Sequence, residues 1–551
     1  MPLRYGWYLG SGTPPRAFPT EPFLMPESTS PQAEPRNLIR LWFCVAVGVA
    51  LWFSPAPEGL STPAWHTAAV FAATIMGFLL RPLPMGPCVM IGLLALATTG
   101  VFYDASHPNS QAAIAWRDVM GLSNPQTMTP YATNGLEIPS WQVRLKESFA
   151  YSLTGFANTT VWLVVAAFLV AGAMIRTGLG RRIALTMISR LGGTTLGLGY
   201  AITLAELCLA PFIPSNTARG GGVMAPIVNS LSHALGSTAE ENPRRAGAYL
   251  TLVGAHANLI AAAMFLTGMA ANPLVSAAAS DVFGVQFGWG RWILGALAPG
   301  LVSMAILPLF IYGVCKPQAD CSGAAREEAR SELRDMGAWT PKQATMATVL
   351  AGMLLLWATG PLQKAWLGAS LPTAMVALLG VAALVVLGVE RWKDVIGNAA
   401  AWDALIWLGG LVTMASALKA TGFVAWLADR VGAEVTGLPP LTTAIVLAIV
   451  YFYSMYAFSM LTGHILAFAA VFFSVALSVG APPLLMVALV AYFSNLCGCT
   501  TNYSSGPVVI YYGLGYVSAN RWFAVGWFVS LLHLAVWLGV GLPYWKMLGW
   551  W

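Results

Sequence analysis

The sequence predicts an all-α polytopic membrane protein with about 11 or 12 transmembrane segments, arranged as two inverted repeats with re-entrant helical hairpins. Three observations lead to this prediction. Hydrophobic residues make up 57% of the 551 residues and charged residues only 9%, whereas roughly 25% of residues are charged in an average soluble domain. Apolar segments of membrane-spanning length recur along the chain, and each half contains a short polar interruption.

The chain begins with residues 1–36, which are rich in Pro, Ser and Gly. This segment lacks the apolar centre and small-residue cleavage site of a signal peptide, so we expect a disordered N-terminal extension. The first apolar segment runs from about Leu38 to Phe53, and we expect it to be retained as a true span.

Two membrane repeats are expected to follow, residues 37–315 and residues 346–551. In the first repeat, further spans or partial spans centre near positions 70, 92, 165, 200, 255 and 300. In the second they centre near positions 352, 380, 410, 448, 470, 488 and 530. Some of the shorter segments have the length of re-entrant hairpins.

A charged linker, residues 316–345, separates the two repeats. Between Arg326 and Arg334, opposite charges stand three and four positions apart, which is typical of a solvated helix. Basic residues also cluster directly after a span, at Arg176, Arg181, Arg182 and Arg190. Because Lys and Arg concentrate in cytoplasmic loops, we expect the cluster and the linker on the cytoplasmic side.

Several function classes are disfavoured by the sequence. The net charge of +6 is spread over short connections without a basic run, so nucleic acid is not an expected partner. The seven cysteines form neither a zinc-type pair of CxxC motifs nor a disulfide framework, and Cys497-Gly498-Cys499 has no His or acidic neighbour. No HExxH or GxSxG motif and no paired intramembrane aspartates occur. We therefore expect neither an enzyme nor a bound metal or cofactor.

The first polar interruption is the run Pro214-Ser215-Asn216-Thr217-Ala218-Arg219-Gly220-Gly221-Gly222. Ser215, Asn216 and Thr217 offer hydroxyl, amide and backbone N–H groups, which suit a carboxylate. Helix N-termini nearby add partial positive charge. A broken helix at membrane depth is tolerated where protein or a watery cavity satisfies its polar groups, so the run indicates a transport site. Alternatively, these side chains merely cap a helix.

The second interruption, Phe458-Ser459-Met460-Leu461-Thr462-Gly463-His464, is the weaker counterpart. Thr217 and Thr462 are separated by 462 − 217 = 245 positions, and a basic residue follows each of them by two. The offset recurs at Trp162 and Trp407 (407 − 162 = 245). Paired interruptions in two repeats are typical of a transporter that binds its substrate between the repeats.

These residues carry a family resemblance. Four segments together resemble the divalent anion/sodium symporter family. They are the first interruption, the run Phe265-Leu266-Thr267-Gly268-Met269-Ala270-Ala271-Asn272-Pro273-Leu274, the triplet Thr462-Gly463-His464, and Ser494-Asn495-Leu496 with residues 506–513. The resemblance is strongest to the branch of citrate/succinate and tartrate/succinate antiporters and plastid 2-oxoglutarate/malate translocators. It extends from about residue 38 to the end of the chain.

The resemblance implies a set of binding residues and an assembly. Asn216 and Thr217 would contact substrate from the first half, and Thr462 with Thr500 and Thr501 from the second. Gly268 and Asn272 resemble an unwound segment that completes the first site, although Gly and Asn also form ordinary turns. The resemblance also implies a homodimer.

The chain departs from the sodium-coupled members in its second half. Those members have Ser-Asn-Thr in both halves, whereas this chain has Met460-Leu461-Thr462, and Met and Leu supply no oxygen ligand. Arg219 and His464 instead place basic groups beside the two interruptions, which favours exchange without sodium. Arg219 can alternatively form a structural ion pair with Glu206, which is the role we favour for Glu206, and His464 can be a neutral, hydrogen-bonded ring.

The sequence and the resemblance together imply a secondary transporter in the bacterial inner (plasma) membrane. It would exchange di- or tricarboxylates by alternating access, and succinate, malate, tartrate, citrate and 2-oxoglutarate are all candidate substrates. A sodium-coupled dicarboxylate symporter is the alternative.

Overall fold

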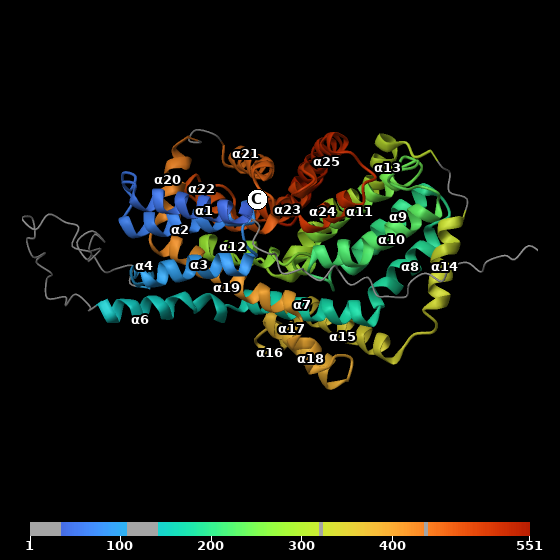
Figure 1. Ribbon diagram of the computed structural model, residues 1–551, viewed down its shortest axis with the longest axis horizontal. Coiled ribbons are helices and arrows are strands. Elements are labelled where there is room, and N and C mark those ends of the chain that lie inside the picture. The colour runs from blue at the N-terminus through green and yellow to red at the C-terminus, as the bar shows by residue number, and fades with distance from the viewer. Residues whose placement is uncertain (1–34, 107–140, 319–322, 435–438) are drawn as a thin grey trace, which may run out of the picture.

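A computed structural model describes residues 35–106, 141–318, 323–434 and 439–551. Within these ranges every regular element is a helix, and the predicted all-α class is confirmed (Figure 1). In the described part of the chain, eight helices are long and apolar enough to cross a membrane, and four shorter apolar helices accompany them. The eight long and four shorter helices agree in number with the predicted 11 or 12 transmembrane segments. Most of the expected N-terminal extension lies outside the described residues.

The elements of the first half have these bounds: α1 Pro35–Phe53, α2 Thr62–Leu80, α3 Met85–Thr98, α4 Val101–Ser106, α6 Trp141–Ser152, η2 Thr154–Ala157, α7 Thr159–Thr177, α8 Leu179–Leu191, α9 Thr195–Leu209, η3 Ala218–Met224, α10 Ala225–Ala234, α11 Gly247–Met264, η4 Leu266–Gly268, α12 Asn272–Phe283 and α13 Trp289–Cys315.

The elements of the linker and the second half have these bounds: α14 Ala324–Asp335, α15 Pro341–Ala358, α16 Gly360–Leu367, α17 Thr373–Val386, α18 Trp392–Ile396, α19 Ala399–Ala420, α20 Phe423–Glu434, α21 Pro440–Tyr453, η5 Ser454–Ala457, α22 Leu461–Ser478, α23 Pro483–Leu496, η6 Cys497–Thr500, α24 Gly506–Gly513, α25 Ala519–Gly539 and α26 Gly541–Met547. Every span centre expected from the sequence falls inside one of the helices α2 to α25.

The internal repeat is visible in the order of the elements. The series α7, α8, α9, interruption, α11, η4, α12, α13 has its counterpart in α19, α20, α21, interruption, α23, η6, α24, α25. The predicted offset between the two halves also holds at the ends of α7 and α19, the helices that open the two series. Gly178 follows α7 with φ 71°, and Gly422 follows the end of α19 with φ 89°, so each glycine supplies the left-handed turn that stops its helix.

The charged linker packs against the basic cluster. Helix α14 lies beside α8 at one end of the molecule (Figure 1). Arg181 forms an ion pair with Glu332 at 2.7 Å, and Arg326 Nε donates to the carbonyl of Ser189 at 2.8 Å. The linker and the cluster therefore lie together, and their cytoplasmic location stays a prediction. Helix α15 begins at Pro341, near the expected end of the linker, where Thr340 forms a capping box with Gln343.

Helix α11 forms the centre of the first half. It packs against α9, α13 and α23, and all of its residues are buried. A helix that is apolar on every side is typical of a segment surrounded by protein. Its polar side chains, including His256 and Asn258, therefore lie in the interior.

Candidate functional site

The first interruption is a tightly packed turn between α9 and α10. The chain leaves α9 after Leu209 and enters the π-helix η3 at Ala218, and single turns of π-helix often mark functional sites. A Cβ atom at Gly221 would lie 2.2 Å from Ile510 Cδ1, and one at Gly220 would lie 2.8 Å from Asn258 Nδ2. The glycine run therefore allows α24 and α11 to approach the turn closely.

Arg219 is fully buried, and its guanidinium group joins this turn to its neighbours. Arg219 Nε donates to Glu206 Oε2 at 2.7 Å. Its Nη1 donates to the carbonyls of Ile213 and Gly268, both at 2.9 Å, and its Nη2 donates to the carbonyl of Asn258 at 3.1 Å. The ion pair predicted between Arg219 and Glu206 is therefore present.

The pair of Arg219 and Glu206 has a structural consequence. Because both side chains are completely buried, removing either one would leave an uncompensated charge, which costs about 3–5 kcal/mol. The ionised pair contributes no net charge to the site. A direct role for Arg219 as the counter-charge of a bound anion stays a prediction.

The polar side chains at the tip of the interruption differ in their hydrogen bonding. Ser215 Oγ accepts from the N–H of Ala218 at 3.1 Å, so Ser215 is a local cap. Among the described residues, the side chains of Asn216 and Thr217 have no hydrogen-bond partner. Thr217 faces the start of α24, where a Cβ atom at Gly506 would lie 2.2 Å from Thr217 Oγ1. Asn216 and Thr217 are therefore available to a ligand.

In the second interruption, His464 lies in an aromatic pocket. The ring is fully buried, and its Nε2 is 2.8 Å from Ser454 Oγ. Its centroid is 4.3 Å from that of Tyr451, 5.2 Å from that of Phe458 and 5.7 Å from that of Phe468. The alternative interpretation of His464 was a neutral, hydrogen-bonded ring, and the structure contains such a hydrogen bond. The role of His464 as a positive charge stays a prediction.

The predicted threonines of the second half fall into two groups. Thr500 Oγ1 donates to the carbonyl of Cys497 at 2.8 Å and is thereby engaged in its own turn. Thr501 Oγ1 and Ser459 Oγ are buried and have no hydrogen-bond partner among the residues that the structure describes. Thr462 is half-buried in the first turn of α22, with no hydrogen bond to its hydroxyl within the described chain.

Gly268 and Asn272 hold the unwound segment between α11 and α12. Asn272 Nδ2 donates to the carbonyls of Ala262 and Phe265, both at 2.9 Å. Its Oδ1 accepts from Asn495 Nδ2 at 2.8 Å, which links the two halves of the protein. The carbonyl of Gly268 accepts from Arg219. Both residues therefore organise the site in this conformation, and direct contact with substrate stays a prediction.

Residues 497–506 bring the two interruptions to one region. At the start of this segment, a Cβ atom at Gly498 would lie 3.4 Å from Leu461 Cδ2, in the second interruption. At its end, Gly506 contacts Thr217 of the first interruption. Leu461 and Thr217 therefore both border the segment that contains Thr500 and Thr501.

Sequence analysis did not single out Asn258. This residue donates from Nδ2 to Glu206 Oε2 at 3.0 Å and to the carbonyl of Asn216 at 3.2 Å. Its counterpart is Asn495 (495 − 258 = 237), and each is followed by a Leu. Within the described ranges, the amide oxygens of both residues are buried and accept no hydrogen bond, although their Nδ2 groups donate. A lone amide in an otherwise apolar helix was the signal that could have identified Asn258.

The described residues contain no group of three or more His, Cys, Asp or Glu side chains that could hold a metal ion. Cys497 and Cys499 are buried, and their thiols lie 3.6 Å and 3.7 Å from the carbonyls of Ser494 and Gly526. They pack as small side chains of the interior.

Comparison with known proteins identifies the family of the chain. Residues 35–551 match the family model described as the sodium:sulfate symporter transmembrane region. The chain belongs to this family. Among its relatives, the putative malate transporter YflS of Bacillus subtilis (strain 168) is 38% identical over 516 residues, covering 94% of this chain and 97% of that protein.

Two further family members and one solved structure extend the comparison. The chloroplastic dicarboxylate transporter 1 of Spinacia oleracea is 35% identical, over 92% of this chain and 81% of its own length. The citrate/succinate antiporter of Escherichia coli (strain K12) is 32% identical, over 92% of this chain and 98% of its own length. The YdaH transporter of Alcanivorax borkumensis superposes with a TM-score of 0.50 at 15% identity, over 73% of this chain and 90% of that one. This last likeness concerns the fold alone.

Proposed function

We propose that this protein is a secondary transporter that exchanges di- or tricarboxylates across the membrane by alternating access. The named relatives are a putative malate transporter, a dicarboxylate transporter and a citrate/succinate antiporter. The free side chains of Asn216 and Thr217, beside a buried helix interruption, supply donors of the kind that carboxylates bind. Succinate, malate, tartrate, citrate and 2-oxoglutarate remain the candidate substrates.

The observation that carries exchange without sodium is the set of acceptors around Arg219. Three main-chain carbonyls, those of Ile213, Asn258 and Gly268, receive its hydrogen bonds. Carbonyls of unwound segments are the groups that coordinate sodium in many secondary transporters. The carbonyls of Ile213 and Gly268 lie outside the α-helices, and that of Asn258 lies within α11. Because the positively charged guanidinium group already binds these three oxygens, it disfavours a second cation beside them at the first interruption.

The second interruption supports the same proposal by its composition. Met460 and Leu461 precede Thr462, and neither side chain supplies an oxygen. Hard cations require oxygen ligands. A sodium site at this interruption would therefore have to rely on Thr462 and the backbone.

A sodium-coupled symporter is the second candidate, and one observation favours it. Several buried oxygens have no hydrogen-bond partner in the described chain: Glu206 Oε1, Asn258 Oδ1, Ser459 Oγ, Asn495 Oδ1 and Thr501 Oγ1. Oxygens of this kind can coordinate a cation or hold ordered water. A sodium titration of transport distinguishes the two candidates.

The charge of a carboxylate substrate needs compensation, and the pair of Arg219 and Glu206 is neutral when both are ionised. We assign part of the compensation to the helix N-termini that begin at the interruptions and unwound segments, which are those of α12 at Asn272, α22 at Leu461 and α24 at Gly506. Hydrogen-bond donors of Asn216 and Thr217 would further compensate the charge of the substrate.

We further propose that the transporter resides in the bacterial inner (plasma) membrane as a homodimer without enzymatic activity. Bacterial relatives and the apolar helices support the membrane assignment, although chloroplast proteins also belong to the family. The homodimer rests on the family resemblance.

Counterflow identifies the substrate class directly. Proteoliposomes loaded with unlabelled succinate would be diluted into labelled succinate, with malate, tartrate, citrate, 2-oxoglutarate or sulfate as external competitors. Competition by the carboxylates and not by sulfate supports the proposal. Competition by sulfate alone would reject it.

A further inference from the structure

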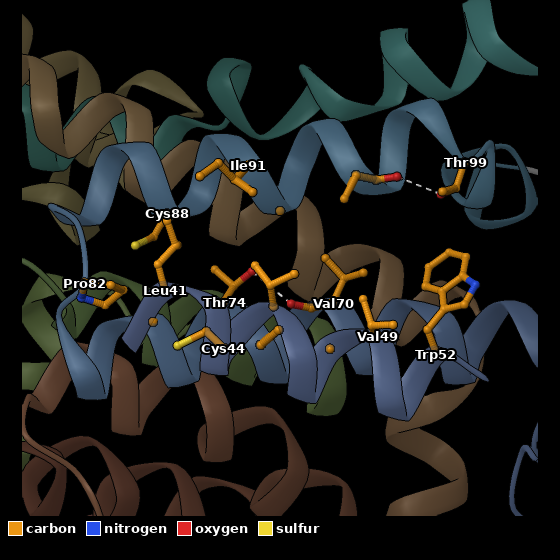
Figure 2. A pocket seen from close by; sticks show the side chains of 16 residues that line it. Leu41, Cys44, Val49, Trp52, Val70, Thr74, Pro82, Cys88, Ile91 and Thr99 are labelled. Atoms are coloured by element: carbon orange, nitrogen blue, oxygen red, sulfur yellow. Dashed lines mark hydrogen bonds between the residues drawn. The ribbon is translucent and has the colours of Figure 1, made fainter. Parts of the chain in front are cut away.

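An apolar cavity of about 240 Å³ lies between α1, α2 and α3, on elements that contribute nothing to the two interruptions (Figure 2). Helix α3 borders it on one side, and α1 and α2 border it on the other. Side chains such as Leu41, Val49, Trp52, Val70 and Ile91 line its wall.

The polar atoms of the lining offer little to water. Thr74 Oγ1 donates to the carbonyl of Val70 at 2.9 Å, and Thr99 Oγ1 donates to that of Ala95 at 2.8 Å. The thiol of Cys88 points to the carbonyl of Leu83 at 3.7 Å. A buried water needs about two to four polar partners, and an apolar cavity of roughly 150 Å³ in another protein stays dry and binds benzene. This cavity therefore favours an apolar guest.

The surrounding helices present apolar side chains outward. On α1, the exposed fractions are 69% for Ile39, 68% for Trp42 and 75% for Phe53. On α3, Met90 and Leu94 are about half exposed. In a membrane protein, such surfaces contact lipid. The hydrocarbon available to fill the cavity is therefore that of a lipid.

Two arginines flank one end of the cavity. Leu41 and Pro82 line it, and they directly follow Arg40 and Arg81 in the chain. Arg40 Nη1 donates to the carbonyl of Leu80 at 3.3 Å, which places Arg40 at the end of α2 beside Arg81. Both side chains are exposed, and neither has an ion-pair partner in the described part of the chain. This end of the cavity therefore carries uncompensated positive charge.

We propose that this cavity is a binding site for one anionic phospholipid. An acyl chain fills the space between α1, α2 and α3, and the phosphate binds between Arg40 and Arg81. Guanidinium groups suit phosphate because their planar donors match its oxygens. The proposal does not depend on which anion the protein transports.

The site has a connection to the transport core through α3. Helix α3 packs against α19, and a Cβ atom at Gly410 would lie 2.2 Å from Val89 Cγ1. Interiors that are this closely packed transmit small displacements. A lipid that fixes α3 therefore also supports α19, the helix of the second half that corresponds to α7.

Photo-crosslinking tests the proposal on the full chain in nanodiscs. The probes are phosphatidylglycerol and phosphatidylcholine, each with a diazirine on one acyl chain, and labelled peptides are mapped by mass spectrometry. We expect labelling of lining residues on α1, α2 and α3. We expect phosphatidylglycerol to label them on the order of tenfold more than phosphatidylcholine, because two basic residues attract an anionic headgroup by about this factor.

Variants separate the headgroup contact from the chain contact. The double variant Arg40→Gln with Arg81→Gln should remove the preference for phosphatidylglycerol and keep the labelling by both lipids. Arg291→Gln is the matched control, since Arg291 is also exposed and also donates to a carbonyl, that of Gln286 at 2.8 Å. Ala95→Leu places a larger side chain in the cavity wall and should reduce labelling by both lipids.

Native mass spectrometry of the wild-type protein, released from membranes with both lipids, gives a second measurement that does not depend on the variants. One retained phosphatidylglycerol molecule per chain is the expected result. Equal labelling by the two lipids, or labelling of the cavity no stronger than that of other exposed helices, would overturn the proposal. Crosslinks that show the cavity filled by residues 1–34 of the same chain would overturn it as well.

Discussion

Arg219 and Glu206 form an ion pair with an Nε to Oε2 distance of 2.7 Å, and neither side chain is exposed. The pair joins the first helix interruption to α9, and the remaining donors of Arg219 extend the connection to α11 and η4. Arg219 therefore organises three segments at once, in addition to any effect of its charge on a substrate.

Replacing Arg219 by Ala should abolish exchange and lower the stability of the protein. The substitution leaves Glu206 buried and unpaired, which costs about 3–5 kcal/mol. Stability would be measured by thermal unfolding in detergent, and exchange by counterflow in proteoliposomes.

The double variant Arg219→Ala with Glu206→Ala separates the two roles of the arginine. Because no unpaired charge remains, we expect much of the stability to return while transport stays absent, since the three carbonyls have lost their donor. A double variant that transports at the wild-type rate would show that Arg219 is a structural partner alone.

Asn216→Ala and Thr217→Ala should each weaken the apparent affinity for the substrate. A lost hydrogen bond to a buried partner costs roughly 1–3 kcal/mol, which corresponds to about five- to 150-fold in affinity. Concentration dependence of exchange measures the effect. Ser232→Ala is the control, because this buried hydroxyl donates to Val228 within its own helix. Unchanged affinity in both test variants, at normal expression, would assign Asn216 and Thr217 a structural role.

Asn272 and Asn495 should be energetically coupled, because their side-chain amides meet across the two halves at 2.8 Å. Asn272→Ala also removes donors to Ala262 and Phe265, so we expect it to destabilise more than Asn495→Ala. A double-mutant cycle of thermal stability should give a coupling of about 0.5–3 kcal/mol. Strict additivity would mean that this contact does not contribute to stability.

His464→Ala should reduce exchange less than Arg219→Ala does, and the deficit should grow as the pH falls. Only the protonated wild-type ring carries a charge that attracts the substrate, so the variant loses more at lower pH. Initial rates of both proteins between pH 5 and 8 would be compared. A constant ratio of rates across this range would indicate that a neutral ring acts through its bond to Ser454.

The sequence predicted the helices well, because spans depend on local composition. Apolar runs located α1 to α3, α7, α9, α11, α13, α15, α17, α19, α21 to α23 and α25, whereas most of the shorter helices were not expected. The Thr-Gly pairs at Thr177 and Thr421 marked equivalent helix ends. The pairing of Arg219 with Glu206 was predictable for a similar reason. Two opposite charges close together in an apolar region have few other ways to be neutralised.

The side-chain contacts of the site could not be predicted in the same way. Asn272 and Asn495 are 223 positions apart, so only the packing of α12 on α23 brings them together. The engagement of Arg219 with three carbonyls depends on backbone orientation, which composition does not encode. The cavity between α1, α2 and α3 likewise arises from the fit of three helices.

Exchange without sodium is the central claim, and uptake of labelled succinate into proteoliposomes tests it most directly. Vesicles would contain either unlabelled dicarboxylate or none, and the external sodium would be replaced by choline in matched samples. We predict uptake only into the loaded vesicles, at the same rate in sodium and in choline. Strong uptake into empty vesicles that requires an inward sodium gradient would contradict the account and establish the sodium-coupled symporter.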